Sequence, residues 1–297
     1  MRRFALGLLC LLLATPALAG RRCGDDVEGR PVPCDCGDVL VGSRTLGGDD
    51  PITSRVCPGT GLFVDVPENR SATLGLGGYV LAGSGRGFGI EVLRGGTGGL
   101  TIVGPGGVRG FDVGLLAPTG QLALLSHFLA ADQRSDGVRV VGRGYAIVDC
   151  EALDNGHDGF ALGGIGYRSE GNRALGNRRY GFRLSGHDAA IGGTAGNEAA
   201  GNARDGLHVR GRGHALDAAV ATANGGHGIR ARISQGRISG AVASGNRARG
   251  LRAFGSDLTV SASEARGEGG GIDVRGARVH DGGGNRAADC RVGGPCR

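Results

Sequence analysis

The feature that most constrains the fold is a four-residue unit, glycine–apolar–any–apolar, that recurs through most of the chain. Its ten copies begin at Gly61, Gly89, Gly114, Gly137, Gly159, Gly181, Gly206, Gly228, Gly250 and Gly271. The intervals between successive glycines are 28, 25, 23, 22, 22, 25, 22, 22 and 21 residues. A unit this short cannot bury its own apolar face, so it must stack on its neighbours as in a solenoid.

A second mark accompanies the unit. An asparagine lies four residues before the glycine in five consecutive copies, at Asn155, Asn177, Asn202, Asn224 and Asn246. Between these marks, alanine-rich segments alternate in polarity, which predicts short strands with one buried face. We expect each asparagine to form a sharp corner in the left-handed conformation that it tolerates. Its side-chain amide can also bond from one repeat to the next.

Together these marks predict an all-β, right-handed parallel β-helix of about ten rungs, each rung being one coil of about 22 residues. Parallel crossovers favour right-handed winding, and a left-handed hexapeptide coil would show a strict six-residue period. Glycine provides 64 of the 297 residues, which suggests many turns with positive φ. Collagen is excluded because the glycines do not fall at every third position.

The N-terminal segment predicts export. Arg2 and Arg3, an apolar run over 4–14 and a small-residue site at 17–19 form the pattern of a signal peptide. We therefore expect a secreted or periplasmic protein. The most apolar later segment, 114–131, contains interrupting polar residues, so no membrane span is expected. The predicted organisation is a signal peptide at 1–19, an N-terminal cap at 20–60, the parallel β-helix at 61–280 and a C-terminal cap at 281–297.

Cysteines cluster at both ends of the expected mature chain. The disulfide candidates are Cys23, Cys34, Cys36, Cys57, Cys290 and Cys296. Cys150 is in phase with the apolar positions around it, which predicts a buried free thiol. One residue separates Cys34 from Cys36, too few for the usual zinc-binding spacing, so no metal site is predicted.

Residues at equal positions of successive rungs should stack into lines. The outward position inside the unit gives the line Phe63, Glu91, Leu116, Arg139, Ala161, Arg183, His208, Arg230, Arg252 and Asp273. The next outward position gives Ser185, Arg210, Arg232, Phe254 and Arg275. All 34 basic residues of this chain are arginines. The candidate ligand-binding residues are therefore Arg183, His208, Arg210, Arg230, Arg232 and Arg252.

Stacked guanidinium groups repel one another unless an anion bridges them, and their forked donors suit carboxylates and sulfates. The functional hypothesis is a groove for an anionic polysaccharide. The alternative is that an arginine-rich chain simply fills solvated positions with arginine. Neutral sugars are disfavoured because tryptophan is absent, and nucleic acid is not expected as a partner. The sequence leaves the oligomeric state open.

The "GFRL", "GLHV" and "GIRA" units with their "GN" or "AN" corners resemble right-handed parallel β-helix repeat proteins of the pectate-lyase-like superfamily, over about 36–280. That fold hosts lyases, hydrolases, epimerases and adhesins. The resemblance implies a polysaccharide lyase or a related carbohydrate-active enzyme, such as a glycoside hydrolase, as one alternative. No cofactor is expected unless the protein is a lyase, for which the resemblance implies Ca²⁺ beside an arginine base. On the outward line the only acidic residues, Glu91 and Asp273, are far apart, so no catalytic residues can be named. A purely structural rod or assembly subunit is the other alternative.

One further motif, "NGHDGF", carries His157 and Asp158 immediately before a repeat glycine. Asp136 and Asp205 occupy the same position as Asp158 in other copies. We interpret these aspartates as turn-forming residues, with calcium binding as the lesser alternative, and His157 as a solvent-facing turn residue.

Overall fold

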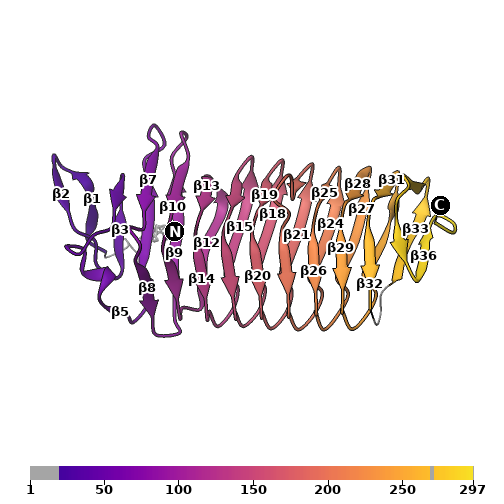
Figure 1. Ribbon diagram of the computed structural model, residues 1–297. Coiled ribbons are helices and arrows are strands. Elements are labelled where there is room, and N and C mark those ends of the chain that lie inside the picture. Colours follow the sequence, from indigo (N-terminus) through magenta and orange to yellow (C-terminus); the bar gives the residue numbers. More distant parts are fainter. Residues whose placement is uncertain (1–19, 268–270, 297) are drawn as a thin grey trace, which may run out of the picture.

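The computed structural model describes residues 20–267 and 271–296, so the expected signal peptide lies outside the described residues. The described chain coils into a right-handed parallel β-helix that is elongated along its axis (Figure 1). Each rung contributes one strand to each of three sheets, and two of those sheets contain eleven strands. The predicted fold class is confirmed, with one rung more than the repeat count indicated.

Sheet 1 is the fourteen-stranded sheet and carries the repeat units. Its strands are β1 (Arg22–Val27), β2 (Arg30–Val32), β3 (Asp38–Leu40), β6 (Leu62–Val66), β9 (Phe88–Gly95), β12 (Val113–Gly120), β15 (Val138–Arg143), β18 (Phe160–Ile165), β21 (Phe182–His187), β24 (Leu207–Arg212), β27 (Ile229–Ser234), β30 (Leu251–Ser256), β33 (Gly271–Ala277) and β36 (Asp289–Val292). All its neighbouring strands pair in parallel except β1 with β2.

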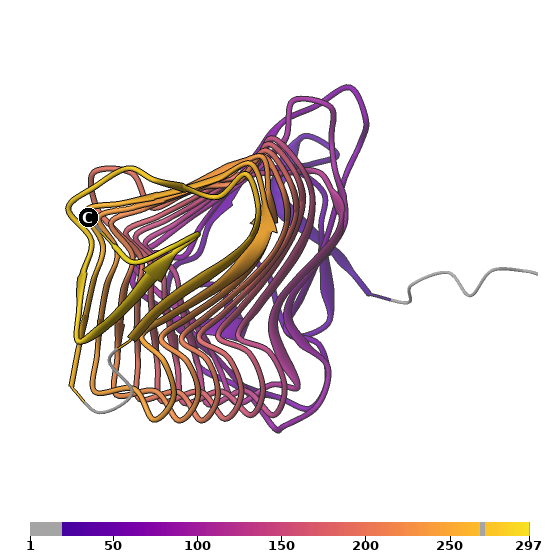
Figure 2. The same cartoon turned by 90° about the vertical axis from the view of Figure 1, so that its right-hand side faces the viewer.

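Sheets 2 and 3 complete each rung (Figure 2). Sheet 2 comprises β4 (Arg44–Thr45), β7 (Ala72–Gly75), β10 (Leu100–Val103), β13 (Leu122–Ser126), β16 (Ala146–Val148), β19 (Arg168–Glu170), β22 (Ala190–Ile191), β25 (Ala215–Asp217), β28 (Gly236–Ser239), β31 (Leu258–Ser261) and β34 (His280–Asp281). Sheet 3 comprises β5 (Val56–Cys57), β8 (Val80–Gly83), β11 (Gly107–Arg109), β14 (Leu129–Ala131), β17 (Glu151–Leu153), β20 (Arg173–Leu175), β23 (Glu198–Ala200), β26 (Val220–Thr222), β29 (Val242–Ser244), β32 (Glu264–Arg266) and β35 (Arg286–Ala287). No helix of the described residues is long and apolar enough to cross a membrane.

The repeat glycine is needed for space rather than for a positive φ. At Gly181, a Cβ atom would lie 2.7 Å from the carbonyl oxygen of Gly206 and 2.8 Å from Nδ2 of Asn202. Gly181 is not among the glycines with positive φ, unlike Gly176 and Gly201 at the neighbouring corners. The unit therefore begins with glycine because the chain passes close to the next rung there. The positive φ that we inferred from the high glycine content occurs instead at corner glycines such as Gly176 and Gly201.

The core is a set of stacked lines inside the coil. The first apolar residue of the unit points inward, and Phe160 stacks on Phe182 with ring centroids 5.0 Å apart. Tyr145 and Tyr167 stack in the same way at 5.1 Å, and both are buried. The stacking of neighbouring rungs thus buries the apolar face that a single rung would leave exposed, as the period predicts.

The asparagines form a buried ladder at the corner between sheets 3 and 1. Each donates from Nδ2 to Oδ1 of the asparagine on the next rung, at 2.9 Å in every step from Asn155 to Asn246. The predicted amide ladder is confirmed, but the predicted left-handed conformation is wrong. It belongs to the preceding residue, for example Asp154 with φ 54° and Ala223 with φ 52°.

A second, shorter ladder lies at the corner between sheets 2 and 3, where Asn172 donates to Asn197 at 3.0 Å. Both side chains are fully buried. The sequence signal for it was an asparagine after glycine in "EGNRAL" and "AGNEAA", which we did not separate from the main series.

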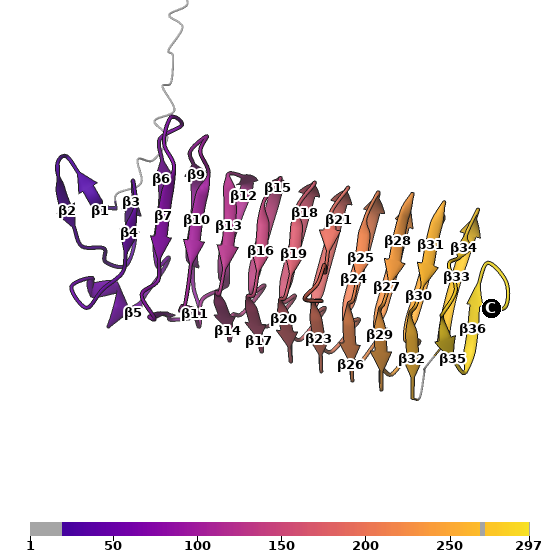
Figure 3. The ribbon, with the colours of Figure 1, turned by 45° about the horizontal axis from the view of Figure 1, so that its top comes forward.

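The N-terminal end is closed by the antiparallel hairpin β1–β2, which adds to sheet 1 at β3 (Figure 3). The segment predicted as the N-terminal entry and cap, 20–60, contains a rung of its own, since β3, β4 and β5 pair in register with the next rung. Disulfides join Cys23 to Cys34 and Cys36 to Cys57.

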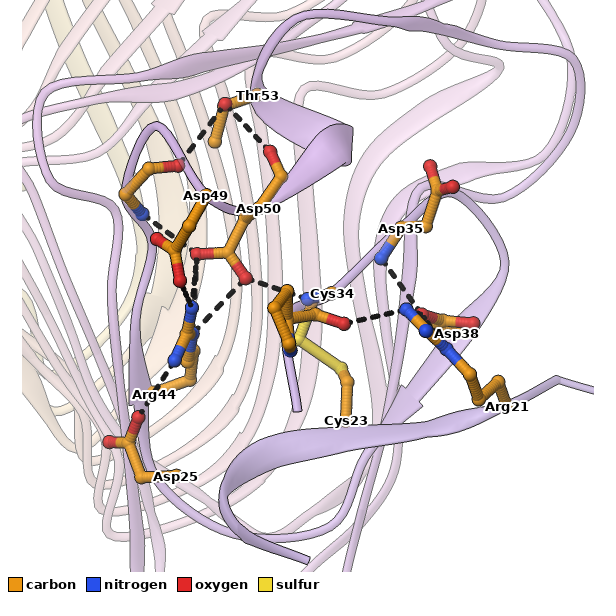
Figure 4. A network of polar contacts seen from close by, with 12 residues as sticks. Arg21, Cys23, Asp25, Cys34, Asp35, Asp38, Arg44, Asp49, Asp50 and Thr53 are labelled. Carbon is orange, nitrogen blue, oxygen red and sulfur yellow. Dashed lines mark hydrogen bonds and ion pairs between the residues drawn. A yellow bond between two sulfur atoms is a disulfide. The ribbon is translucent and has the colours of Figure 1, made fainter. Parts of the chain in front are cut away.

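A buried ion pair links the same segments, as Figure 4 shows. Arg44 Nη2 lies 2.9 Å from Oδ2 of the fully buried Asp50, whose Oδ1 accepts a hydrogen bond from the Cys34 amide. The short 3₁₀ helix η1 (Pro51–Thr53) follows directly. Because both charges are paired and hydrogen-bonded, this network fixes the first rung against the hairpin.

The C-terminal segment 281–296 continues the coil through β35 and β36, and the Cys290–Cys296 disulfide closes the end. All six disulfide candidates are therefore paired. Cys150 is free and fully buried, as predicted, and burial raises the pKa of its thiol to about 12.

Candidate functional site: a cationic face on sheet 1

The predicted outward lines exist as continuous rows across sheet 1. Arg183 on β21 is paired in register with His208 on β24, then Arg230 on β27 and Arg252 on β30. Two positions further along each strand, Ser185, Arg210, Arg232 and Phe254 form the second row. The six candidate residues thus share one face over four consecutive rungs, and we call this surface the cationic face.

The first row is less exposed than an outward position suggests. Arg183, Arg230 and Arg252 are partly buried, and His208 is only 5% exposed to solvent. The second row is open, since Arg210 and Arg232 are both exposed. Side chains of the corner between sheets 3 and 1 contact the first row, since Asp158 is bound to Arg183 and Asp205 to His208.

A third row runs along that corner, at the position immediately before each repeat glycine. Its members from β15 to β30 are Asp136, Asp158, Tyr180, Asp205, His227 and Arg249. The three aspartates are buried, and each accepts at Oδ1 a backbone N–H from the next rung, such as that of His227 at 2.9 Å for Asp205. These aspartates lie in the corner, in keeping with the turn-forming role we expected, but they also lie beside the cationic line, which the sequence analysis did not predict. Asp136 and Asp205 each contact the third residue after them, whereas Asp158 contacts Arg183 on the next rung.

Upstream, the aspartates neutralise the arginines of the first row. Asp136 Oδ2 lies 2.6 Å from Nη2 of Arg139, and Asp158 Oδ2 lies 2.5 Å from Nε of Arg183. Arg179 adds a longer contact of 3.7 Å to Asp158. His157, by contrast, is exposed as predicted and contacts the Ser135 hydroxyl at 3.1 Å. Arg139 and Arg183, the upstream arginines of the first row, are therefore each paired with a carboxylate.

On β24 the row contains a histidine in place of an arginine. His208 Nδ1 lies 3.1 Å from Asp205 Oδ2, and Arg210 Nε donates to His208 Nε2 at 2.9 Å. Since Nε2 accepts this bond, the proton sits on Nδ1 and is donated to the carboxylate. The Tyr180 ring packs 4.7 Å from the imidazole. Burial raises the pKa of Asp205, but the bonds from His208 and the His227 amide outweigh it, so the net shift is downward.

On β27 and β30 the compensation ends. Within the described ranges, Arg230, Arg232 and Arg252 have neither a carboxylate within 4.0 Å nor a hydrogen-bond partner. Arg252 packs over Phe254, 5.1 Å from the ring centroid, and its Nε is buried without a partner. His227 is in the corner slot that aspartate occupies upstream. Burial lowers the pKa of His227, and Arg252 and Arg230 lower it further.

Beyond β30 the charges are paired again. Asp273 accepts a hydrogen bond at 2.8 Å from Nε of Arg275, and Arg249 lies 2.8 Å from Asp289. In the part of the chain that the structure describes, no group of three or more His, Cys, Asp or Glu residues is placed to hold a metal ion. The corner aspartates in particular are already engaged by backbone amides and by Arg or His.

No family model matches this sequence, and no curated protein sequence matches it. Several solved structures do. The A-module of the mannuronan C-5 epimerase AlgE6 from Azotobacter vinelandii is 14% identical with a TM-score of 0.41, covering 86% of this chain and 90% of its own. The periplasmic alginate epimerase AlgG is 16% identical at 0.42, covering 81% and 84%. The Dettilon tailspike protein gp208 is 14% identical at 0.44, and the match spans 53% of its length. At these identities the likeness is one of fold alone.

Proposed function

We propose that this protein is exported and binds an anionic polysaccharide on the cationic face. The observation that carries the proposal is that Arg230, Arg232 and Arg252 have no carboxylate partner among the described residues, although the same rows pair Arg139, Arg183 and Arg275 with carboxylates. Like charges on adjacent strands repel at close range, so the folded state gains when an external anion lies between them.

Two further features support this ligand class and location. Guanidinium forks match the planar carboxylates and the sulfates of acidic glycans, and a row that repeats at each rung suits a repeating polymer. The three disulfides fit an oxidising compartment, in agreement with the signal-peptide pattern at 1–19.

The test is calorimetric titration with a polyuronate at low and at moderate salt. We expect binding that weakens as salt screens the charges, and a loss of about tenfold in affinity for Arg232→Gln, because one charge-assisted contact is removed. The matched control is Arg266→Gln on sheet 3, where the side chain is 69% exposed and pairs with Glu264. Equal binding by both variants, or none by the wild-type protein, would overturn the proposal.

A second candidate, a polysaccharide lyase, is favoured by one observation. The Asp205–His208 pair orients an imidazole whose Nε2 carries a lone pair, the state required of a general base. Arg210 covers this nitrogen, so it would have to move for the base to reach substrate. Incubation with polygalacturonate and alginate, with and without Ca²⁺, tests this: unsaturated products should absorb in the ultraviolet and disappear with His208→Gln. Their absence would remove the lyase candidate and leave the binding proposal intact.

A further inference from the structure

Four arginines of the cationic face lack a carboxylate partner in the part of the chain that the structure describes, and we call them the arginine quartet: Arg210, Arg230, Arg232 and Arg252. They occupy three consecutive strands, β24, β27 and β30. The register places Arg210 opposite Arg232 and Arg230 opposite Arg252. The quartet is therefore two pairs of guanidinium groups, each pair spanning two neighbouring rungs.

Both ends of the quartet are closed by arginines that are already neutralised. Upstream, Arg183 is bound to the buried Asp158 at 2.5 Å, and the second row offers only Ser185. Downstream on β33, the first row continues as Asp273 and the second row as Arg275, and these two residues are bound to each other at 2.8 Å. Because paired charges attract an anion weakly, the attractive surface has a defined length of three rungs.

The spacing within the quartet selects a charge density. Neighbouring strands of a sheet lie about 4.8 Å apart, and a pyranose unit in an extended glycan advances by a similar length. A chain laid along the helix axis would thus present one sugar to each rung. A glycan with an anion on every sugar meets an arginine at each step, whereas one with an anion on alternate sugars leaves every second rung without a partner.

Arg252 provides an independent sign that a ligand completes this surface. Its Nε is buried with no hydrogen-bond partner among residues 20–267 and 271–296, while its guanidinium lies over the Phe254 ring. A buried donor without an acceptor is unfavourable. Turning the guanidinium from the ring toward an anion between β27 and β30 would satisfy that donor.

We infer that the arginine quartet is a bounded subsite for about three consecutive sugars, each bearing an anionic group, in a chain aligned with the helix axis. This inference rests on the proposed polysaccharide binding. It adds where on the cationic face the glycan lies, how much of it is held and what charge spacing is recognised.

The experiment is a titration series with oligouronates from the dimer to the octamer. We expect affinity to rise steeply to about the trimer or tetramer and then to level off. A steady rise to the octamer would overturn the bounded subsite while leaving polysaccharide binding in place. Failure of all oligomers and of the polymer to bind would overturn both.

The charge spacing is tested with hyaluronan, which carries a carboxylate on alternate sugars, at the same chain length as a polyuronate. We expect affinity at least tenfold lower for hyaluronan, since fewer guanidinium groups are engaged. Equal affinities would overturn the proposed spacing.

A gain-of-function variant tests the upstream boundary directly. Ser185 is exposed and is in register with Arg210, so Ser185→Arg adds an unpaired guanidinium on β21. The plateau should move to an oligomer about one sugar longer. Its control is Arg237→Gln on sheet 2, which should leave the plateau unchanged, because Arg237 binds Asp217 on another side of the coil. An unchanged plateau in Ser185→Arg would contradict the boundary.

Discussion

Two stretches of sheet 1 differ in whether their arginines are paired with carboxylates. On β15 and β21, Arg139 and Arg183 are held by the buried aspartates Asp136 and Asp158. On β27 and β30, Arg230, Arg232 and Arg252 have no such partner in the described chain. The backbone course and the strand register are common to both stretches, so the difference comes from the side chains at the corner and at the outward positions of the strands. A uniform scaffold can therefore carry a neutral and a cationic segment side by side.

The largest expected effect concerns the scaffold that both stretches share. Asn177→Ala upstream and Asn224→Ala downstream each remove a buried amide that bonds the rungs on either side. Each should lower the free energy of unfolding by about 3 kcal/mol or more, because several buried polar groups lose their partners. Chemical denaturation measures it. Costs that differ greatly between the two positions would show that the scaffold is not uniform.

Releasing an upstream arginine should make that stretch resemble the downstream one. Asp158→Asn keeps an acceptor for the Tyr180 amide but removes the charge that holds Arg183. We expect a loss of about 2 kcal/mol in stability, together with tighter polyuronate binding. Thermal denaturation and calorimetry give the two quantities. Unchanged or weaker binding would contradict the role assigned to pairing.

The converse change should neutralise part of the downstream stretch. His227 occupies the corner slot of Asp158 and Asp205, so His227→Asp would supply a carboxylate to Arg230. Affinity for polyuronate should fall about tenfold, through loss of a free guanidinium and repulsion of the ligand. His227→Asn is the matched neutral control, and similar losses in both variants would mean that the imidazole itself matters.

The smallest expected effect is a dependence of stability on pH, which tests the role of the buried neutral histidines His214 and His227. Burial lowers the pKa of His214 in the core and of His227 at the corner, so the folded state favours their neutral forms. The unfolded chain therefore binds more protons, and stability is complete above about pH 6.5 and declines as pH falls below it. Melting temperatures across this range should show the decline. It should be shallower in His214→Gln, and an identical profile would exclude His214 as a source.

The interior of the coil and its cationic face differ in how far the sequence predicts them. The period predicted the fold, the inward line through Phe160 and Phe182, and the stacking of Arg183, His208, Arg230 and Arg252, because register follows directly from equal repeat positions. It also predicted the asparagine ladder and the free thiol of Cys150. Each of these features involves residues that share a single position in the repeat.

Contacts between residues at different repeat positions could not be predicted from the period. Asp158 and Arg183 are on neighbouring rungs and in different lines, and only the curvature of the corner brings their side chains together. For the same reason the sequence did not show that Arg44 and Asp50 pair behind the N-terminal hairpin, or that segment 20–60 forms a rung.

What the sequence determined by itself is the architecture: a period of about 22 residues fixes which residues stack, since each unit can bury its apolar face only against its neighbours. What the tertiary structure alone decided is which charges remain free. Whether an arginine is neutralised depends on the few ångströms between a corner side chain and the strand that follows it, and electrostatic attraction at that range changes steeply with distance and burial.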